Sequence, residues 1–210
     1  MIHRFSCSLC LLALTASGEV PGIHLADKTL DVQLIDSDEK EFFISQTMDL
    51  SGRLFVGCRE ALYVYEPAAD GGFGPRRELY RFPKDSWLYD LEVYGNDLFV
   101  LANTALYRIR DAITRRSNLE PEKLLWGKPQ GHFHQGLHGM EFGPTGDLFL
   151  SMGDPQPHMH WDRSRPDHLW HWVFYVGPDN KEVPYTGVGA VFRYRLEDHF
   201  LTVHASGLRN

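Results

Sequence analysis

The stretch Gly52-Arg53-Leu54-Phe55-Val56 recurs twice along the chain, as Asn96-Asp97-Leu98-Phe99-Val100 and as Gly146-Asp147-Leu148-Phe149-Leu150. The first two copies are each followed by a second phrase, Ala61-Leu62-Tyr63-Val64 and Ala105-Leu106-Tyr107-Arg108. Both phrases repeat after 44 positions, from Leu54 to Leu98 and from Ala61 to Ala105. A repeat of roughly 40–50 residues made of short strands is typical of β-propeller blades. The sequence therefore predicts an all-β fold, a β-propeller.

The repeats divide the chain into about three blades, near residues 49–88, 89–130 and 131–205 of a partial propeller over 49–210. Residues 19–48 form an N-terminal segment that supplies the opening strands. A propeller needs four or more blades to close and protect its sheet edges. We therefore expect an incomplete array that belongs to the N-terminal part of a larger protein, or to a truncated product, and that is inactive by itself.

Composition and charge restrict the class of protein. The 210 residues are 43% hydrophobic and carry a formal net charge of -7, which argues against a nucleic-acid partner. Residues 1–18 have a basic start, an apolar stretch and small residues, as in a secretory signal peptide. The expected location is periplasmic or extracellular. Cys7 and Cys10 would leave with the signal, so Cys58 would be the one cysteine of the mature chain.

An insertion interrupts the third repeat. The second phrase follows the first by eight positions in the first two blades, but in the third it corresponds to Ala190-Val191-Phe192, so residues 155–187 are inserted into one hairpin. Long insertions in repeat arrays are often functional. The pairs His132/His134 and His158/His160 have the i, i+2 spacing that can share a metal ion on a strand, or they serve as hydrogen-bonding groups of a polar loop.

A second constellation runs from Gly131 to Asp154. It has a His-rich entry, a strand, a Gly-Pro turn, a second strand and a terminal Gly-Asp. Because the two ends of a hairpin lie close together, His134 or His138 could meet Asp154 at one mouth of the fold. A His oriented by a carboxylate is a workable general base, whereas the alternative is that Asp154 only caps a turn.

These residues resemble a known signature. His134 or His138, Phe142-Gly143-Pro144, Gly153-Asp154 and Gly207-Leu208-Arg209-Asn210 are similar to the motifs of quinoprotein glucose/sorbosone dehydrogenases. Gly136-Leu137-His138-Gly139-Met140 and the stretch from Pro184 to Arg195 resemble the propeller of the large bacterial "membrane-bound dehydrogenase" proteins of planctomycetes.

The resemblance implies a six-bladed propeller in the complete protein, with pyrroloquinoline quinone (PQQ) and calcium as cofactors. It assigns the general base to His134, with His138 as the rival, and the supporting carboxylate to Asp154. Arg209 would lie beside the quinone and Asn210 would contact it. Calcium ligands and a c-type cytochrome domain would lie beyond Asn210, and that domain or another acceptor would take the electrons. The implied reaction is hydride transfer from a sugar or alcohol to PQQ.

Two other functions are compatible with the residues. A non-catalytic propeller could bind a glycan or a partner protein through Trp161, Trp170 and Trp172 of the insertion, because indole rings stack well on sugars. A calcium-dependent, lactonase-like hydrolase would also use His and carboxylates around a metal.

Overall fold

The computed structural model describes residues 32, 34–115, 117–127, 136–153 and 170–208, which contain fourteen strands. The strands are β1 (Ser45–Met48), β2 (Leu54–Gly57), β3 (Ala61–Tyr65), β4 (Arg77–Arg81), β5 (Leu88–Tyr94), β6 (Asp97–Ala102), β7 (Ala105–Ile109), β8 (Pro121–Gly127), β9 (Leu137–Phe142), β10 (Leu148–Met152), β11 (Trp170–Val176), β12 (Lys181–Gly187), β13 (Gly189–Arg195) and β14 (Phe200–Leu208).

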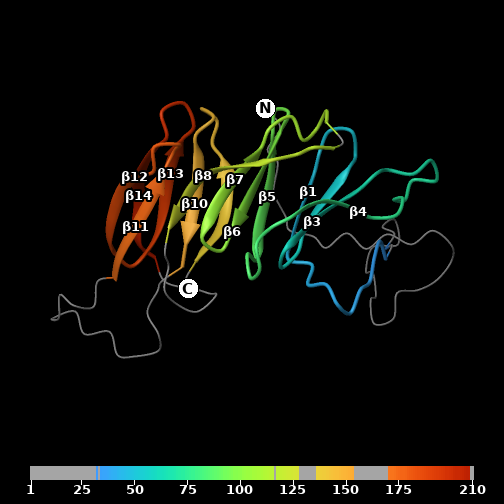
Figure 1. Ribbon diagram of the computed structural model, residues 1–210, viewed down its shortest axis with the longest axis horizontal. Helices are drawn as coiled ribbons and strands as arrows, with labels where there is room; N and C mark the ends of the chain where they lie inside the picture. Colours follow the sequence, from blue (N-terminus) through green and yellow to red (C-terminus); the bar gives the residue numbers. More distant parts are fainter. Residues whose placement is uncertain (1–31, 33, 116, 128–135, 154–169, 209–210) are drawn as a thin grey trace.

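The strands form three antiparallel sheets, which are the blades of a β-propeller. The first blade has the order β1-β2-β3-β4, the second has β5-β6-β7-β8 with β11 and β12 added, and the third has β9-β10-β13-β14. The sheets stand side by side, and neighbouring sheets touch at β1, β5 and β9 (Figure 1). These three are therefore the inner strands. The all-β propeller fold predicted from the repeat is confirmed.

The repeated phrase forms the second strand of each blade. Leu54 and Leu148 begin that strand, Leu98 is its second residue, and all three are buried. The turn before the strand places Gly52 and Gly146 at φ 85° and 82°, a backbone region that disfavours side chains with a Cβ atom. Apolar strand residues and a glycine turn thus explain why the phrase recurs.

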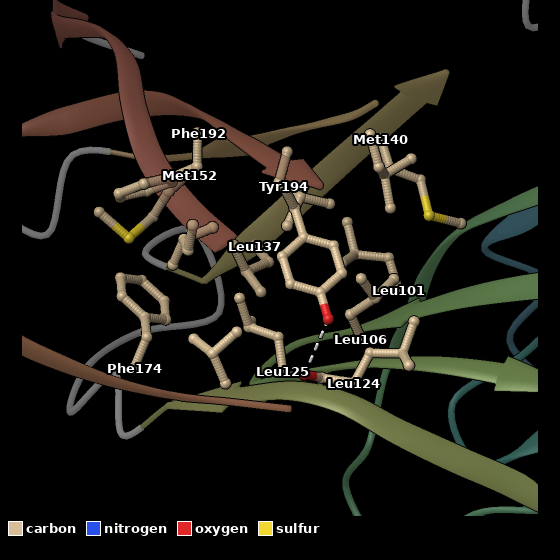
Figure 2. Packing of buried hydrophobic residues seen from close by; sticks show 14 of the residues in the cluster. Leu101, Leu106, Leu124, Leu125, Leu137, Met140, Met152, Phe174, Phe192 and Tyr194 are labelled. Atoms are coloured by element: carbon tan, nitrogen blue, oxygen red, sulfur yellow. Dashed lines mark hydrogen bonds between the residues drawn. The ribbon is translucent and has the colours of Figure 1, made fainter. Parts of the chain in front are cut away.

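Apolar side chains fill the seams between the blades. Figure 2 shows the seam between the second and third blades, where Leu106, Leu125 and Phe192 pack in one buried cluster. Tyr194 is completely buried there, and its hydroxyl donates a hydrogen bond to the Leu124 carbonyl at 3.3 Å. A second cluster, which includes Phe55 and Leu98, fills the seam between the first and second blades.

The insertion contributes regular structure. β10 pairs directly with β13, from Leu148 opposite Tyr194 to Met152 opposite Ala190, so the predicted hairpin partner of the third blade is confirmed. Within the insertion, β11 and β12 form a hairpin, and β11 pairs with β8 of the second blade through Tyr175 opposite Trp126. A strand pair that belongs to the third blade in sequence therefore widens the second blade to six strands.

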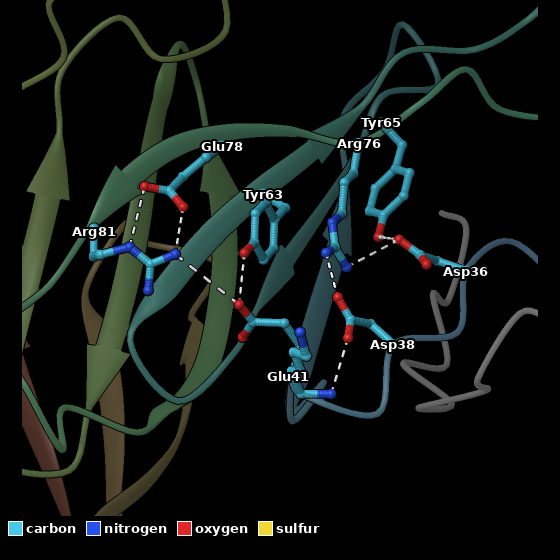
Figure 3. Close-up of polar contacts among 9 residues, drawn as sticks. Asp36, Asp38, Glu41, Tyr63, Tyr65, Arg76, Glu78 and Arg81 are labelled. Carbon is cyan, nitrogen blue, oxygen red and sulfur yellow. Dashed lines mark hydrogen bonds and ion pairs between the residues drawn. The ribbon is translucent and has the colours of Figure 1, made fainter.

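The side of the first blade that carries Tyr63 and Tyr65 is covered by polar residues that precede β1 (Figure 3). The Tyr65 hydroxyl donates to Asp36 and the Tyr63 hydroxyl donates to Glu41, each at 2.8 Å. Arg76 forms ion pairs with both Asp36 and Asp38. These contacts hold residues 34–44, which contain no strand, against the blade.

Candidate functional site

Among the predicted site residues, His138 is the one within the described part of the chain. It is the second residue of β9. His134, Asp154, Arg209 and Asn210 lie outside the described residues. The metal-binding pairs His132/His134 and His158/His160 lie outside them as well.

The described residues nearest to these positions gather at one end of the third blade. The Gly153 amide donates to the Gly136 carbonyl at 3.3 Å, at the start of β9 and the end of β10. Gly189, at the start of β13, lies opposite Leu208, at the end of β14. The Leu137 amide reaches the Asn103 carbonyl of the second blade at 3.2 Å. We name this end of the blades the loop rim.

Two inner strands carry a β-bulge close to the loop rim. In β9, Leu137 faces Met152 and Gly139 faces Ser151, so His138 is the extra residue of a bulge. In β5, Leu88 faces Ala102 and Asp90 faces Leu101, so Tyr89 is the extra residue there. A bulge redirects a side chain out of the regular alternation, and bulges are frequent next to active sites.

The two bulged residues meet. The rings of Tyr89 and His138 lie 5.0 Å apart between centroids, at an interplanar angle of 62°. Both side chains are half-buried, and burial raises the pKa of Tyr89. An imidazole and a phenol ring therefore meet in an edge-to-face arrangement at the seam between the second and third blades.

Asp90 follows Tyr89 and reaches across the same seam. Its Oδ2 atom accepts a hydrogen bond from the Met140 amide of β9 at 2.7 Å, and Oδ1 accepts one from the Leu91 amide at 2.9 Å. Burial raises the pKa of Asp90, and the two amide hydrogen bonds offset this only in part. The two residues Tyr89 and Asp90 thus contact His138 and Met140 respectively.

Gly139 lies between these two contacts. A Cβ atom at this position would lie 3.1 Å from Ser151 Oγ and 3.7 Å from Asp90 Oδ2. The absence of a side chain therefore leaves room for both oxygens beside β9.

The first seam has a related contact. Ser45 of β1 aligns with Asp90, because Ser45 faces Gly57 of β2 as Asp90 faces Leu101 of β6. The Ser45 hydroxyl donates to the Leu88 carbonyl of the next inner strand at 2.7 Å. Each of these two seams is therefore crossed by one polar side chain from the same blade position.

Neither Tyr89 nor Asp90 was identified from the sequence. Their neighbourhood reads as an ordinary strand, and a bulge adds a residue without a composition signal. When the first two blades are aligned on Leu54 and Leu98, Ser45 corresponds to Tyr89. It corresponds to Asp90 only once the extra residue of the β5 bulge is counted. The sequence feature that could have identified them is the succession of two polar side chains, Tyr89 and Asp90, within an inner strand.

Trp172, one of the tryptophans assigned to a sugar-stacking surface, is buried. It is 3% exposed and lies beside Asn103, Phe174 and Met152. Its Nε1 atom has no hydrogen-bond partner in the described structure. Trp172 packs between the second and third blades, so it offers no free ring face, and its proposed part in stacking on a glycan is wrong.

The bulge cluster has a definite chemical capacity. The imidazole of a His accepts a proton near neutral pH, and a phenol beside it can donate a hydrogen bond. The inner strands carry Asp90, Glu92 and Glu141 but no Lys or Arg within their described ranges. The described residues contain no group of three or more His, Cys, Asp or Glu side chains placed to hold a metal ion. The described part also contains no helix that is long and apolar enough to span a bilayer.

Comparisons with known proteins add the following. No family model and no curated protein matches the chain. One similar solved structure is virginiamycin B lyase from Staphylococcus aureus, with 13% sequence identity and a TM-score of 0.41; the match covers 79% of this chain and 56% of that chain. Another is a streptogramin B lyase, with 11% identity and a TM-score of 0.41, where the match covers 81% of this chain and 56% of that chain. A third is a catalytically inactive S. aureus virginiamycin B lyase with quinupristin, with 10% identity and a TM-score of 0.40, where the match covers 84% of this chain and 74% of that chain. The chain spans just over half the length of the first two.

Proposed function

We propose that the chain forms part of the active rim of a secreted sugar or alcohol dehydrogenase propeller, related to the quinoprotein glucose/sorbosone dehydrogenases, with His138 as the general base. The observation that carries the proposal is the bulged position of His138 on an inner strand. There a substrate bound at the centre of the propeller would meet an imidazole held by its neighbours.

The order of the motifs supports the proposal. The resemblance places His134, Asp154, Arg209 and Asn210 directly before or after described strands whose ends form the loop rim. Three separate strand ends, those of β9, β10 and β14, thus provide the attachment points of these residues at one end of one blade. Sites in propellers are built from such connections.

The implied cofactor fits the described residues poorly. PQQ is a flat tricarboxylate, and a multiply charged anion needs cations close by. The described inner strands offer Asp90, Glu92 and Glu141 and no cation. Arg209 and calcium, whose ligands would lie beyond Asn210, would have to supply that charge.

The chain's own residues can perform the proton transfer. The neutral imidazole of His138 would accept the hydroxyl proton of a sugar or alcohol, and Tyr89 would limit the rotation of the ring. Asp154 would stabilise the resulting cation, as the resemblance implies. Electrons would pass to a cytochrome c domain or another acceptor outside this chain.

The test uses the protein purified from its native host, with extraction of any bound quinone and an assay of dye-linked sugar oxidation. We expect His138→Gln to lower kcat by about 10²–10⁴, the range typical of a general base. His134→Gln is the companion variant. If His134→Gln abolishes oxidation and His138→Gln does not, the dehydrogenase survives but the assignment of the base fails.

A non-catalytic binding propeller is the second candidate. The absence of Lys and Arg from the described inner strands favours it, because a charged cofactor would then lack partners there. Binding of a neutral glycan without turnover, in a preparation free of quinone, would favour this candidate over the dehydrogenase. Lactone hydrolysis without an electron acceptor would instead indicate the lactonase-like propeller.

A further inference from the structure

We infer that Tyr89 and Asp90 act together as positioning residues for His138, fixing both its ring and its strand from the neighbouring blade. The inference extends the proposed function, because it names the residues that control the proposed base. It rests on the contacts across the seam between β5 and β9 and on a comparison with the seam between β1 and β5.

The first step is that the strand of His138 is held on both sides of the bulge. Asp90 Oδ2 accepts the Met140 amide at 2.7 Å, two residues after His138. The Leu137 amide, one residue before it, donates to the Asn103 carbonyl at 3.2 Å. Both partners belong to the second blade. The backbone that carries His138 is therefore attached to that blade at both ends of the four-residue span from Leu137 to Met140.

The second step is that the ring itself has a separate contact. Tyr89 is turned out of its own ladder by the bulge in β5, and its ring packs against His138 at 5.0 Å. Without the bulge, a side chain at this point would follow the regular alternation of the strand. The bulge in β5 thus directs the Tyr89 ring toward His138, the bulged residue of β9.

The seam between the first and second blades is the comparison, because it joins two blades in the same way but does not contain His138. Ser45, which aligns with Asp90, also bridges two inner strands, through its hydrogen bond to Leu88. However, β1 keeps an unbroken register against β2, from Ser45 opposite Gly57 to Met48 opposite Leu54. A polar bridge therefore accompanies both seams, whereas within the described residues two bulged inner strands face each other only at the seam of His138.

The experiment measures the His138 ring directly in the 210-residue chain. Histidines are labelled with ¹³C and ¹⁵N, and the His138 signals are assigned by their loss in His138→Gln. We expect an NOE between the Tyr89 and His138 rings in the wild-type chain. Asp90→Ala should remove it and shift the His138 signals, and Tyr89→Leu, which lacks the ring, should shift the His138 signals as well. Asp90→Asn, which keeps an acceptor oxygen, and Tyr89→Phe, which keeps the ring, should restore the NOE.

Ser45→Ala is the matched control, because it removes the equivalent bridge at the other seam. It should leave the His138 signals in place. The inference is overturned if Asp90→Ala leaves the NOE intact, if Tyr89→Leu leaves the His138 chemical shifts unchanged, or if Ser45→Ala removes the NOE equally. If Asp90→Ala fails to fold, the His138 chemical shifts of Tyr89→Leu and Tyr89→Phe are compared instead. The inference then requires that Tyr89→Leu shifts these signals and that Tyr89→Phe does not.

The activity readout separates this inference from the proposed function. In the protein from the native host, Asp90→Ala should lower kcat by about tenfold with KM unchanged, and Asp90→Asn should recover most of it. Absence of any sugar oxidation, together with the expected NMR changes, would reject the dehydrogenase and leave the positioning of His138 standing.

Discussion

Ser45 and Asp90 occupy the same position in successive inner strands, and each reaches across to the inner strand of the next blade. Ser45 donates to a carbonyl, whereas Asp90 accepts from an amide, so the two bridges have opposite polarity. A neutral hydroxyl crosses one seam, and a half-buried carboxyl whose pKa is raised crosses the other. This difference has a measurable consequence.

The free energy of unfolding of Asp90→Asn, relative to wild type, should increase as the pH rises. Because burial raises the pKa of Asp90 above its ordinary value of 3.8, the native state holds the proton more tightly than the unfolded chain. Wild type therefore loses stability as the pH rises through that pKa, and the Asn variant has no such group. Urea unfolding of both proteins between about pH 3.5 and pH 7 measures the difference. A difference that is constant or falls with pH would show that the Asp90 pKa is not raised.

Asp49→Ala should destabilise the fold strongly at neutral pH. Asp49 and Arg53 form a buried ion pair at 2.7 Å, with 1% and 8% of their side chains exposed. Burial raises the pKa of Asp49, but hydrogen bonds from Ser51 and Arg53 outweigh it and lower the pKa overall. Removing the carboxylate leaves Arg53 unpaired, which should cost about 3 kcal/mol in urea unfolding.

The same variant has an expected pH dependence. Because the folded pKa of Asp49 is depressed, its stabilising effect is present above the unfolded value of 3.8 and is lost as the pH falls through the folded value. The difference in the free energy of unfolding between Asp49→Ala and wild type should therefore become smaller at acidic pH. Asp198→Ala, which breaks the exposed pair with Arg195, should change stability little at any pH. Equal losses for the two variants would contradict the buried character of Asp49.

Gly139→Ala should weaken the seam, and Ser151→Ala in the same chain should restore part of the loss. The new methyl group would lie 3.1 Å from Ser151 Oγ, which is tighter than an ordinary contact, and 3.7 Å from Asp90 Oδ2. Removing the Ser151 hydroxyl frees that space. A double-mutant cycle by thermal unfolding should therefore give a favourable coupling of about 0.5–1 kcal/mol. Strict additivity would mean that β9 shifts as a whole instead.

Tyr194→Phe should lower the free energy of unfolding by about 1 kcal/mol. The Tyr194 hydroxyl donates to the Leu124 carbonyl at 3.3 Å and lies 2.6 Å from His199 Nδ1. The ring is completely buried, so Phe would keep the packing and lose only the polar contacts. Tyr94→Phe, at a residue that is 45% exposed, is the control and should have almost no effect. A loss for Tyr194→Phe no larger than that of the control would show that these contacts add nothing.

Much of the fold could be predicted because the repeated phrase combines buried leucines with a glycine turn. Leu54, Leu98 and Leu148 are equivalent in sequence and in structure. The pairing of β10 with β13 could also be predicted, since Ala190-Val191-Phe192 keeps the repeat pattern after the insertion. Local hydrophobic patterns were therefore sufficient for the blade framework.

The partner of the inserted hairpin could not be predicted. β11 and β12 have strand-forming residues, but nothing in them indicates that Tyr175 lies opposite Trp126 of the second blade. That choice depends on which sheet edge is open once the third blade has folded. The burial of Trp172 follows from the same pairing, which is why it was mistaken for a surface ring.

The candidate site was predicted only in part for a similar reason. His138 was found because it belongs to a recognisable motif. Tyr89 and Asp90 lie on another blade and reach it through a bulge, and bulges depend on the pairing of two strands rather than on one stretch of sequence.

The most direct test of the account compares His138→Gln with His204→Gln in dye-linked oxidation by the protein from its native host. His204 is also a ring-paired histidine, in contact with Phe149, but it lies on the outer strand β14. We expect kcat to fall by about 10²–10⁴ for His138→Gln and to stay unchanged for His204→Gln. Equal rates for both variants and the wild type would contradict the assignment of His138 as the base.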